Sequence, residues 1–476
     1  MFPSNLFLPR PLRQITAVLI TFFLTACANQ TIMVSSAIGE AKEAEENGIV
    51  IWARGNAQDH QRADALITAI KQDPELYVAA RAEMYHIGAG SYASLWDAAY
   101  QENRPPDIVA LDIGDLPDWV AKGRIRPFDN CLNQYPQFEA VRPELWTSVT
   151  WQGQRWGVPH ELGLSLFYFS KSKLRQLGWS EARIEGLPQA IQSGRFSLQE
   201  MQNTAREAID SGVVNPGFGF WNGLRKGTIL NQYAAFNGRI TDPAQPDKLI
   251  ISRSALEQTY AFAQQLRQEN ITPANIASAP WNQSMGNSVW HDVVSHGQVL
   301  FWYAPIWYWV RWAEYYTGNA GGYDYLEDRV GYALLPSGQP GQPGFTWMIT
   351  RFYALSTNRT DEEAARACRV LARATVPENN LKHVTDNYYL SVLQPASFTH
   401  SQGQDSYGQA DILHFGESAS AYGRMLPVHN QYGRYQEVLW DYSIRAESSD
   451  LSPREAANDA IERLQADLGD ALIVEP

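Results

Sequence analysis

Apolar positions in the N-terminal part of the chain alternate between short continuous runs and helical spacings. Short segments at 48–52, 77–84 and 106–111, each rich in apolar residues, predict strands. A helical pattern at 66–70 separates the first two runs, and a second helix is predicted near 95–100. This strand–helix order predicts a mostly parallel sheet that helices cover on both faces, which is an α/β fold.

The stretch Trp156–Lys173 joins two apolar segments through a polar pair. Trp156–Pro159 ends at a proline, and Leu162–Phe169 follows after His160 and Glu161. Two strands separated by a short polar break predict a chain that leaves one lobe and enters another. His160 and Glu161 would then lie at the mouth of a cleft between the lobes, where ligands tend to bind.

Aromatic side chains concentrate in Gln298–Glu314. The first half of this segment predicts a buried strand, Pro305 interrupts it, and a helix is expected from about Ile306. The apolar run before Arg311 is too short to cross a bilayer. The Pro- and Gly-rich segment Pro336–Gly344 predicts a turn-rich connector.

Helix starts in the second half of the chain share one signature. A Ser or Thr followed three residues later by Glu forms a capping box, in which both side chains bind backbone N–H groups of the first turn. Such pairs occur at Ser197/Glu200, Ser254/Glu257, Thr360/Glu363 and Ser452/Glu455. Helices are expected over Asp361–Ala374 and Leu451–Leu468, and the polar, Gly-rich segment 399–424 predicts a loop or an ordered excursion over the cleft.

Residues 1–26 combine a basic start, a short apolar run and small residues, which predicts a secretory signal rather than a membrane span. Leu24–Cys27 resembles the bacterial lipobox, whose cysteine receives lipid before cleavage. An uncleaved anchor and an ordinary signal with a coincidental cysteine are the alternatives. Lipid on Cys27 would hold the protein on a membrane without spanning it, with residues 27–46 as a tether.

The amino-acid composition argues against nucleic acid as a partner and limits the possible disulfide bonds. The 476-residue chain has a formal net charge of −13 at pH 7, whereas nucleic-acid binding relies on clustered Lys and Arg. The three cysteines are an odd number, so at least one is unpaired or modified in an oxidising compartment. A disulfide between Cys131 and Cys368 is one possibility, but no disulfide framework is visible, which favours two isolated thiols.

Two segments resemble family 1 extracellular solute-binding proteins, the sugar-type binding proteins of ABC importers. One is Gly157-Val-Pro, a polar pair and an apolar run that ends in Phe167-Tyr-Phe-Ser-Lys171. The other is PPDIVALDIGDLPDWVAKGRIRPFD, residues 105–129. The resemblance implies a periplasmic-binding-protein-like fold, with two α/β lobes joined by a hinge of several crossovers. The second crossing would fall near Phe345–Ile349 and the third near Gln394–Pro395.

The implied lobes and function follow from the same resemblance. Residues 47–160 and 347–396 would form the N-terminal lobe, and 161–346 and 397–476 the C-terminal lobe. An exported, lipid-anchored monomer would capture a carbohydrate by hinge closure and deliver it to the transmembrane subunits of an ABC permease. Closure follows when the ligand contacts both lobes only in the closed state. No cofactor, metal or nucleic acid is expected, and His160 has only Glu161 beside it as a potential metal ligand.

Candidate ligand-binding residues are of two kinds. A sugar ring stacks its C–H face on an aromatic side chain, and its hydroxyls need hydrogen-bond partners, which charged groups supply most strongly. Residues of both kinds lie beside expected strand ends or crossovers, or at a C-terminal position that the resemblance suggests. They are Trp52, Asp112, Glu161, Trp221, Trp302, Trp307, Trp347 and Arg434, the last together with Tyr432. Core packing is the alternative for each tryptophan, and a lobe-stabilising ion pair is the alternative for Glu161.

Three other functions stay open at this point. Acidic charge and aromatic rings could hold a polyamine or another cationic solute through cation–π contacts. A secreted glycoside hydrolase would need two carboxylates, for which Glu161 and Asp112 could serve, although no sequence pattern pairs them. A tethered surface protein without a ligand is the third alternative.

Overall fold

The computed structural model describes residues 49–54, 80–85, 89–222, 226–242, 244–274, 288–394 and 410–476. The predicted signal, Cys27, the tether and the helix at 66–70 lie outside these residues, and the crossing at Gln394–Pro395 lies partly outside them. Within the described residues, no helix combines the length and the hydrophobicity that a membrane span requires.

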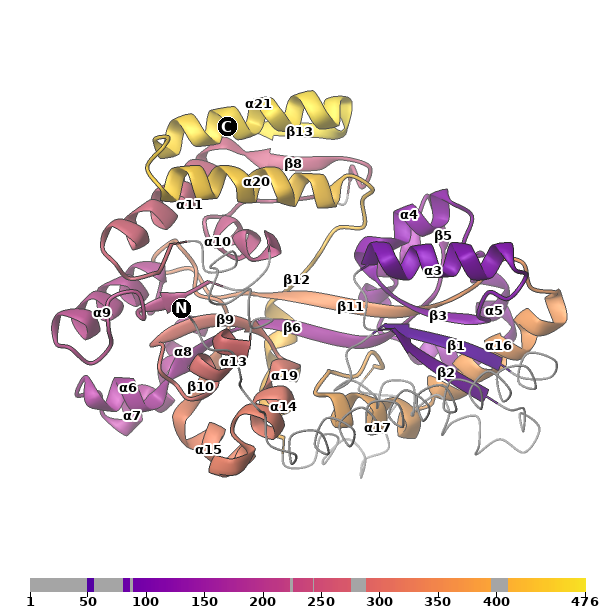
Figure 1. The fold of residues 1–476 in the computed structure, drawn as a ribbon, viewed down its shortest axis with the longest axis horizontal. Coiled ribbons are helices and arrows are strands. Elements are labelled where there is room, and N and C mark those ends of the chain that lie inside the picture. Colours follow the sequence, from indigo (N-terminus) through magenta and orange to yellow (C-terminus); the bar gives the residue numbers. More distant parts are fainter. Residues whose placement is uncertain are drawn as a thin grey trace, which may run out of the picture.

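A single twisted sheet runs through both lobes (Figure 1). Its main path is β2 (Ala80–Tyr85), β1 (Ile49–Arg54), β3 (Ile108–Asp112), β11 (Thr346–Leu355), β6 (Val158–Ser170), β9 (Phe301–Pro305) and β7 (Phe220–Trp221). β1 pairs in parallel with β2 and β3, as predicted. The prediction of parallel pairing is wrong at the centre of the sheet, where β11 is antiparallel to β3 and to β6. There the long strands β6 and β11 cross between the lobes in opposite directions.

The strands β6 and β11 connect the two lobes. β6 pairs with β11 through its first half, and then with β9 and with β10 (Val330–Ala333) from Ser165 onward. β11 pairs with β12 (Gly423–Met425) at its start and with β3 at its end. Figure 1 shows both strands passing from the larger lobe on the left to the smaller lobe on the right. The lobe boundaries at 160/161 and 346/347 stay predictions, and the connection itself is made by these strands.

The polar pair does not break the strand. β6 is continuous over Val158–Ser170, so the prediction of two strands separated by His160 and Glu161 was wrong. The pairing register shifts there, because Glu161 faces Arg351 and Pro159 faces Phe352, which leaves His160 as the extra residue of a bulge. A proline, which has no backbone N–H, is tolerated beside such a bulge.

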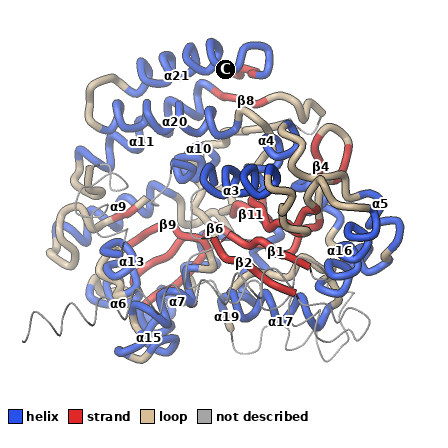
Figure 2. Tube along the Cα trace, turned by 45° about the vertical axis from the view of Figure 1, so that its right-hand side comes forward, coloured by secondary structure: helices blue, strands red, loops and turns tan. Residues whose placement is uncertain are grey.

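Helices cover both faces of the sheet (Figure 2). In the smaller lobe they are α3 (Ala89–Gln101), α4 (Leu116–Ala121), α5 (Asp129–Gln134), α16 (Asp361–Ala374) and α17 (Pro377–Asn387). In the larger lobe they are α6 (Lys171–Gln176), α7 (Glu181–Glu185), α8 (Leu187–Gln192), α9 (Leu198–Asp210), α10 (Ile229–Ala235), α11 (Arg253–Gln268), α13 (Ser288–Ser295), α14 (Tyr308–Arg311), α15 (Gly322–Arg329), α19 (Asp411–Ala419), α20 (Tyr432–Glu447) and α21 (Pro453–Leu468). Short strands complete the fold: β4 (Thr150–Trp151) with β5 (Gln154–Arg155), and β8 (Leu249–Ser252) with β13 (Leu472–Glu475).

Strand alternation divides the buried side chains of the smaller lobe between two cores. Ile49 and Ile51 of β1 join the main core, while Val50 and Trp52 join a second cluster on the opposite face. Both faces of the sheet are therefore packed, as the strand–helix order predicted.

Three of the four capping boxes are confirmed. They begin α9, α16 and α21 at Ser197, Thr360 and Ser452. The box at Ser254 is wrong, because β8 leads directly into α11 and Ser252 is already the N-cap, accepting from the Ala255 N–H. The expected helix Asp361–Ala374 is confirmed as α16, and the segment 399–424 contains α19 and β12 within its described part.

Cys131 of α5 and Cys368 of α16 form a disulfide, with their Cα atoms 5.4 Å apart. The preference for two isolated thiols was therefore wrong. The helices that carry the cysteines pack against each other in the smaller lobe, although 237 residues separate the cysteines in sequence. No local spacing pattern marks a pairing over that distance.

Candidate functional site: an aromatic cleft between the lobes

A cavity of about 470 Å³ lies where β3, β6, β9 and β11 meet α20. The smaller lobe contributes the β3 end, Asp112–Gly114, and the larger lobe contributes β9, α14 and the first turn of α20. Both lobes therefore line one cavity, which is the arrangement that hinge closure requires. Its volume suits a small molecule, because ligand pockets commonly measure about 300–1,000 Å³.

Aromatic rings form much of the cavity wall. Those that line it are Trp290, Tyr303, Trp307, Tyr308, Trp347 and Tyr432. The chain brings several of them together because β9 ends at Pro305 and α14 begins three residues later, so that strand end and helix start face the same space. The predicted break at Pro305 is confirmed.

Gly163 of β6 makes room for Trp307. A methyl group at residue 163 would overlap the Trp307 ring, so a side chain there would displace it. The ring also stacks on Tyr389, with centroids 5.2 Å apart and planes 17° apart. Glycine in a strand interior often marks a close approach of this kind, and here it fixes the half-buried tryptophan at the cavity wall.

The charged groups of the cavity form a pair. Arg351 Nε donates to Asp112 Oδ1 at 2.8 Å, and both residues line the cavity. The Arg351 guanidinium also lies 5.2 Å from the Trp307 ring centroid and donates to Glu161 and to the Tyr389 hydroxyl. Burial lowers the pKa of Arg351, but Tyr389, Asp112 and Glu161 outweigh it, so that the pKa lies well above its usual value. The cleft wall thus carries a fixed cation next to a carboxylate.

Several buried polar atoms of the cavity-lining residues make no hydrogen bond within the described structure. They include Trp290 Nε1, Tyr303 Oη, Trp347 Nε1 and Thr350 Oγ1. Buried polar groups are nearly always paired, and leaving one unpaired costs about 1–3 kcal/mol. A ligand that carries hydroxyl groups would relieve that cost for those atoms that it can reach.

Four of the candidate site residues line the cavity: Asp112, Trp307, Trp347 and Tyr432. Glu161 does not line it, because its side chain is fully buried behind Arg351, whose Nη1 donates to Glu161 Oε2 at 3.3 Å. Its other oxygen lies 2.9 Å from His383 Nε2. The structure therefore favours the ion-pair interpretation of Glu161 over direct ligand contact.

The other predicted residues lie elsewhere. Trp52 and Trp221 are buried in packed clusters, and Trp221 Nε1 donates to the Gly217 carbonyl. Trp302 is fully buried between Tyr168 and Trp312. Because side chains alternate along a strand, Tyr303 faces the cavity and Trp302 faces the opposite side.

Arg434 is likewise turned away from the cavity. It pairs with Asp467 and Glu437 on the outer side of α20. Tyr432 and Gln436 line the cavity from the same helix, since residues four apart share one helix face and a residue two positions away does not.

Some cavity residues were missed in the sequence. Arg351 is the clearest case, because a single charge inside the otherwise apolar segment 346–355 signals a buried cation that needs partners. Trp290 and Tyr308 carried no signal that separates them from core aromatics. Their position depends on how α13 and α14 pack.

The comparisons with known proteins agree with this geometry. The model of the bacterial extracellular solute-binding protein family matches residues 81–371, more than half of the chain. The chain belongs to this family. It is a solute-binding protein of the ABC-transporter class, which confirms the resemblance, and family membership implies export. The comparison with curated proteins found no match.

Solved structures of this solute-binding class share the fold. The GacH receptor of Streptomyces glaucescens, solved unliganded and with acarbose, has a TM-score of 0.68 at 15% identity, covering 89% of this chain and 98% of its own. UgpB from Mycobacterium tuberculosis, in complex with glycerophosphocholine, has a TM-score of 0.68 at 16% identity, covering 88% and 98%. Maltose-bound MalE3 of T. maritima has a TM-score of 0.66 at 14% identity, covering 88% and 99%. These TM-scores establish a shared α/β fold, whereas identities this low say nothing about the ligand of this chain.

Proposed function

We propose that this solute-binding protein captures a carbohydrate, either a mono- or oligosaccharide or a glycoside, between its lobes. The observation that carries the proposal is the composition of the cavity wall. Aromatic faces suit the C–H faces of a sugar ring, and the unpaired indole N–H and hydroxyl groups suit its rim. The structural neighbours in complex with acarbose and maltose support the same ligand class.

Charge balance argues against the polyamine alternative. Among the described residues that line the cavity, Asp112 is the one acidic side chain, and Arg351 neutralises it. A polyamine would bring several positive charges next to a fixed guanidinium, at an electrostatic cost that a neutral, hydroxylated ligand avoids.

The glycosidase alternative has little geometric support. Two carboxylates must flank a glycosidic bond from within the substrate site, whereas Glu161 is buried and lies behind Arg351. The family and the neighbouring structures are binding proteins. We therefore propose release of an unaltered ligand to the transmembrane subunits of an ABC permease, from a monomer that lipid on Cys27 anchors at the outer side of the cell membrane.

Isothermal calorimetry with a saccharide panel and a polyamine panel tests the ligand class. We expect saturable binding of at least one saccharide, together with a smaller radius of gyration by X-ray scattering when it is bound. Saturable polyamine binding without any saccharide response would overturn the carbohydrate proposal. Turnover of a chromogenic glycoside would overturn the assignment as a binding protein.

A further inference from the structure

A second polar cluster lies behind the cleft, where β6 meets α17. Glu161 Oε1 lies 2.9 Å from His383 Nε2 and 3.9 Å from His160 Nδ1. All three side chains are buried, and one potential ligand atom of each lies within 4.8 Å of the others. Imidazole and carboxylate together form a common donor set for zinc and related divalent metals.

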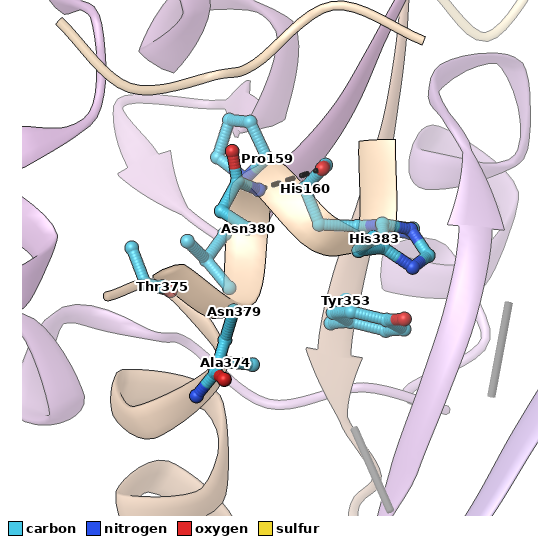
Figure 3. A pocket seen from close by; sticks show the side chains of 9 residues that line it. Pro159, His160, Tyr353, Ala374, Thr375, Asn379, Asn380 and His383 are labelled. Carbon is cyan, nitrogen blue, oxygen red and sulfur yellow. Dashed lines mark hydrogen bonds between the residues drawn. The ribbon is translucent and has the colours of Figure 1, made fainter. Parts of the chain in front are cut away.

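The fold builds this cluster from two separate elements. In a regular strand the side chains of His160 and Glu161 would point to opposite faces, but the bulge at His160 re-aims its ring. The ring stacks on Tyr353 with centroids 3.8 Å apart, and Asn380 Nδ2 donates to the His160 carbonyl at 3.2 Å (Figure 3). These contacts position the imidazole through its ring face and its backbone.

His383 is buried on α17 opposite this ring. Its Nδ1 atom has no hydrogen-bond partner among the described residues. A small cavity of about 20 Å³ adjoins both histidines and is also lined by Tyr353, Asn379 and Asn380 (Figure 3). That volume is enough for one water molecule, and zinc sites with three protein ligands commonly complete their shell with water.

The two oxygens of Glu161 have separate partners. Oε1 faces the histidines, whereas Oε2 accepts from Arg351, which also binds Asp112. Asp112 offsets the charge of Arg351, so the guanidinium orients the carboxylate without cancelling its charge toward the histidines. Polar partners of a ligating carboxylate commonly fix its orientation in this way.

We propose that His160, Glu161 and His383 form a binding site for a divalent transition metal of the zinc type at the base of the hinge. The three ligand atoms are slightly more widely spread than a tetrahedral shell with bonds of about 2.0–2.2 Å requires, so binding draws them together. The metal ties β6, which crosses between the lobes, to α17 of the smaller lobe. Sequence spacing gave no hint of this site, because 222 residues separate His383 from Glu161.

Metal titration of the chelator-treated protein tests this site. Calorimetry with Zn²⁺ should give one site per chain, Co²⁺ should give the visible absorption of a tetrahedral complex, and Zn²⁺ should raise the melting temperature. His383→Gln removes one ligand, and His160→Phe removes another while it keeps the stack on Tyr353. Each should weaken Zn²⁺ binding at least about a hundredfold, since loss of a mere outer-shell partner already costs about 10–100-fold.

The matched control is His296→Gln. His296 lies on the surface, 3.6 Å from Asp292, and thus represents incidental binding by one histidine and one carboxylate. It should leave Zn²⁺ affinity unchanged. Melting temperatures of the metal-free variants confirm that each is folded. Absence of stoichiometric binding to the parent protein would overturn the proposal, and so would a Zn²⁺ affinity of both ligand variants equal to that of the parent, whatever the saccharide titrations show.

Discussion

Arg351 and Asp112 form an ion pair between neighbouring antiparallel strands, with 2.8 Å between Nε and Oδ1. The pair lies at the end of β3 and in the middle of β11, the strand that continues into the larger lobe. Asp112 remains partly exposed at the cavity, while Arg351 is more buried. The arginine therefore holds the carboxylate at the cleft wall.

Asp112→Asn should weaken saccharide binding about tenfold or more. The substitution preserves shape but removes the charge that strengthens hydrogen bonds from ligand hydroxyls, and such bonds contribute about 1.5–3 kcal/mol. The substitution also removes a negative charge that offsets the positive charge of Arg351. Calorimetry on the saccharide found in the panel measures the effect. An unchanged dissociation constant for the saccharide would show that Asp112 does not contribute to ligand binding.

Trp307→Ala should mainly weaken ligand binding, whereas Trp302→Ala should mainly destabilise the fold. Trp307 is half-buried at the cavity, so its loss should weaken ligand binding about tenfold or more with a modest effect on folding. Trp302 is fully buried in the core, and its truncation should cost about 3–5 kcal/mol in the free energy of unfolding. Urea unfolding and calorimetry on the folded fraction measure both quantities. Similar affinity losses in the two variants would contradict this division.

Reduction of the Cys131–Cys368 disulfide should destabilise the smaller lobe. The bond closes a loop across 237 residues of sequence, and removal of a native disulfide typically costs about 2–5 kcal/mol. A reductant should therefore lower the melting temperature of the parent protein. The double variant Cys131→Ser/Cys368→Ser serves as the control, because it should melt low with or without reductant. If thiol labelling shows that the bond has been reduced and the melting temperature of the parent protein is nevertheless unchanged, the disulfide contributes little to stability.

His429 should make stability depend on pH. Burial lowers the pKa of His429 from its usual value of 6.5, against an opposing effect of the Asp247 carbonyl. Its Nδ1 accepts from the Gln431 N–H, a contact that protonation would destroy. The unfolded chain thus binds more protons below pH 6.5, so stability from this group is present at neutral pH and is lost as pH falls through that value.

His429→Gln should flatten this dependence. Urea unfolding between about pH 7.5 and about pH 5 should show a smaller loss of stability in the variant than in the parent protein. Equal slopes for the variant and the parent protein would assign the pH dependence to other groups.

The sequence by itself determined the local structure and the family. Apolar runs fixed the strands β1 and β3, capping boxes fixed the starts of α9, α16 and α21, and Pro305 fixed the end of β9. These features depend on residues that are close together in the sequence, so the sequence alone is enough to predict them. The sequence also singled out Asp112, Trp307 and Trp347, which line one cavity in the structure, while their contact with a ligand stays a prediction.

The tertiary structure decided which member of each local group reaches the cleft. Tyr303 lines the cavity and Trp302 does not, and Tyr432 lines it while Arg434 pairs with Asp467. Strand register and helix rotation make those choices, and both depend on packing against distant elements. The same holds for contacts between residues hundreds of positions apart, such as Cys131 with Cys368 and Glu161 with His383. The sequence gives the chemical type of each side chain, whereas its contacts with residues far away in the sequence depend on the folded structure.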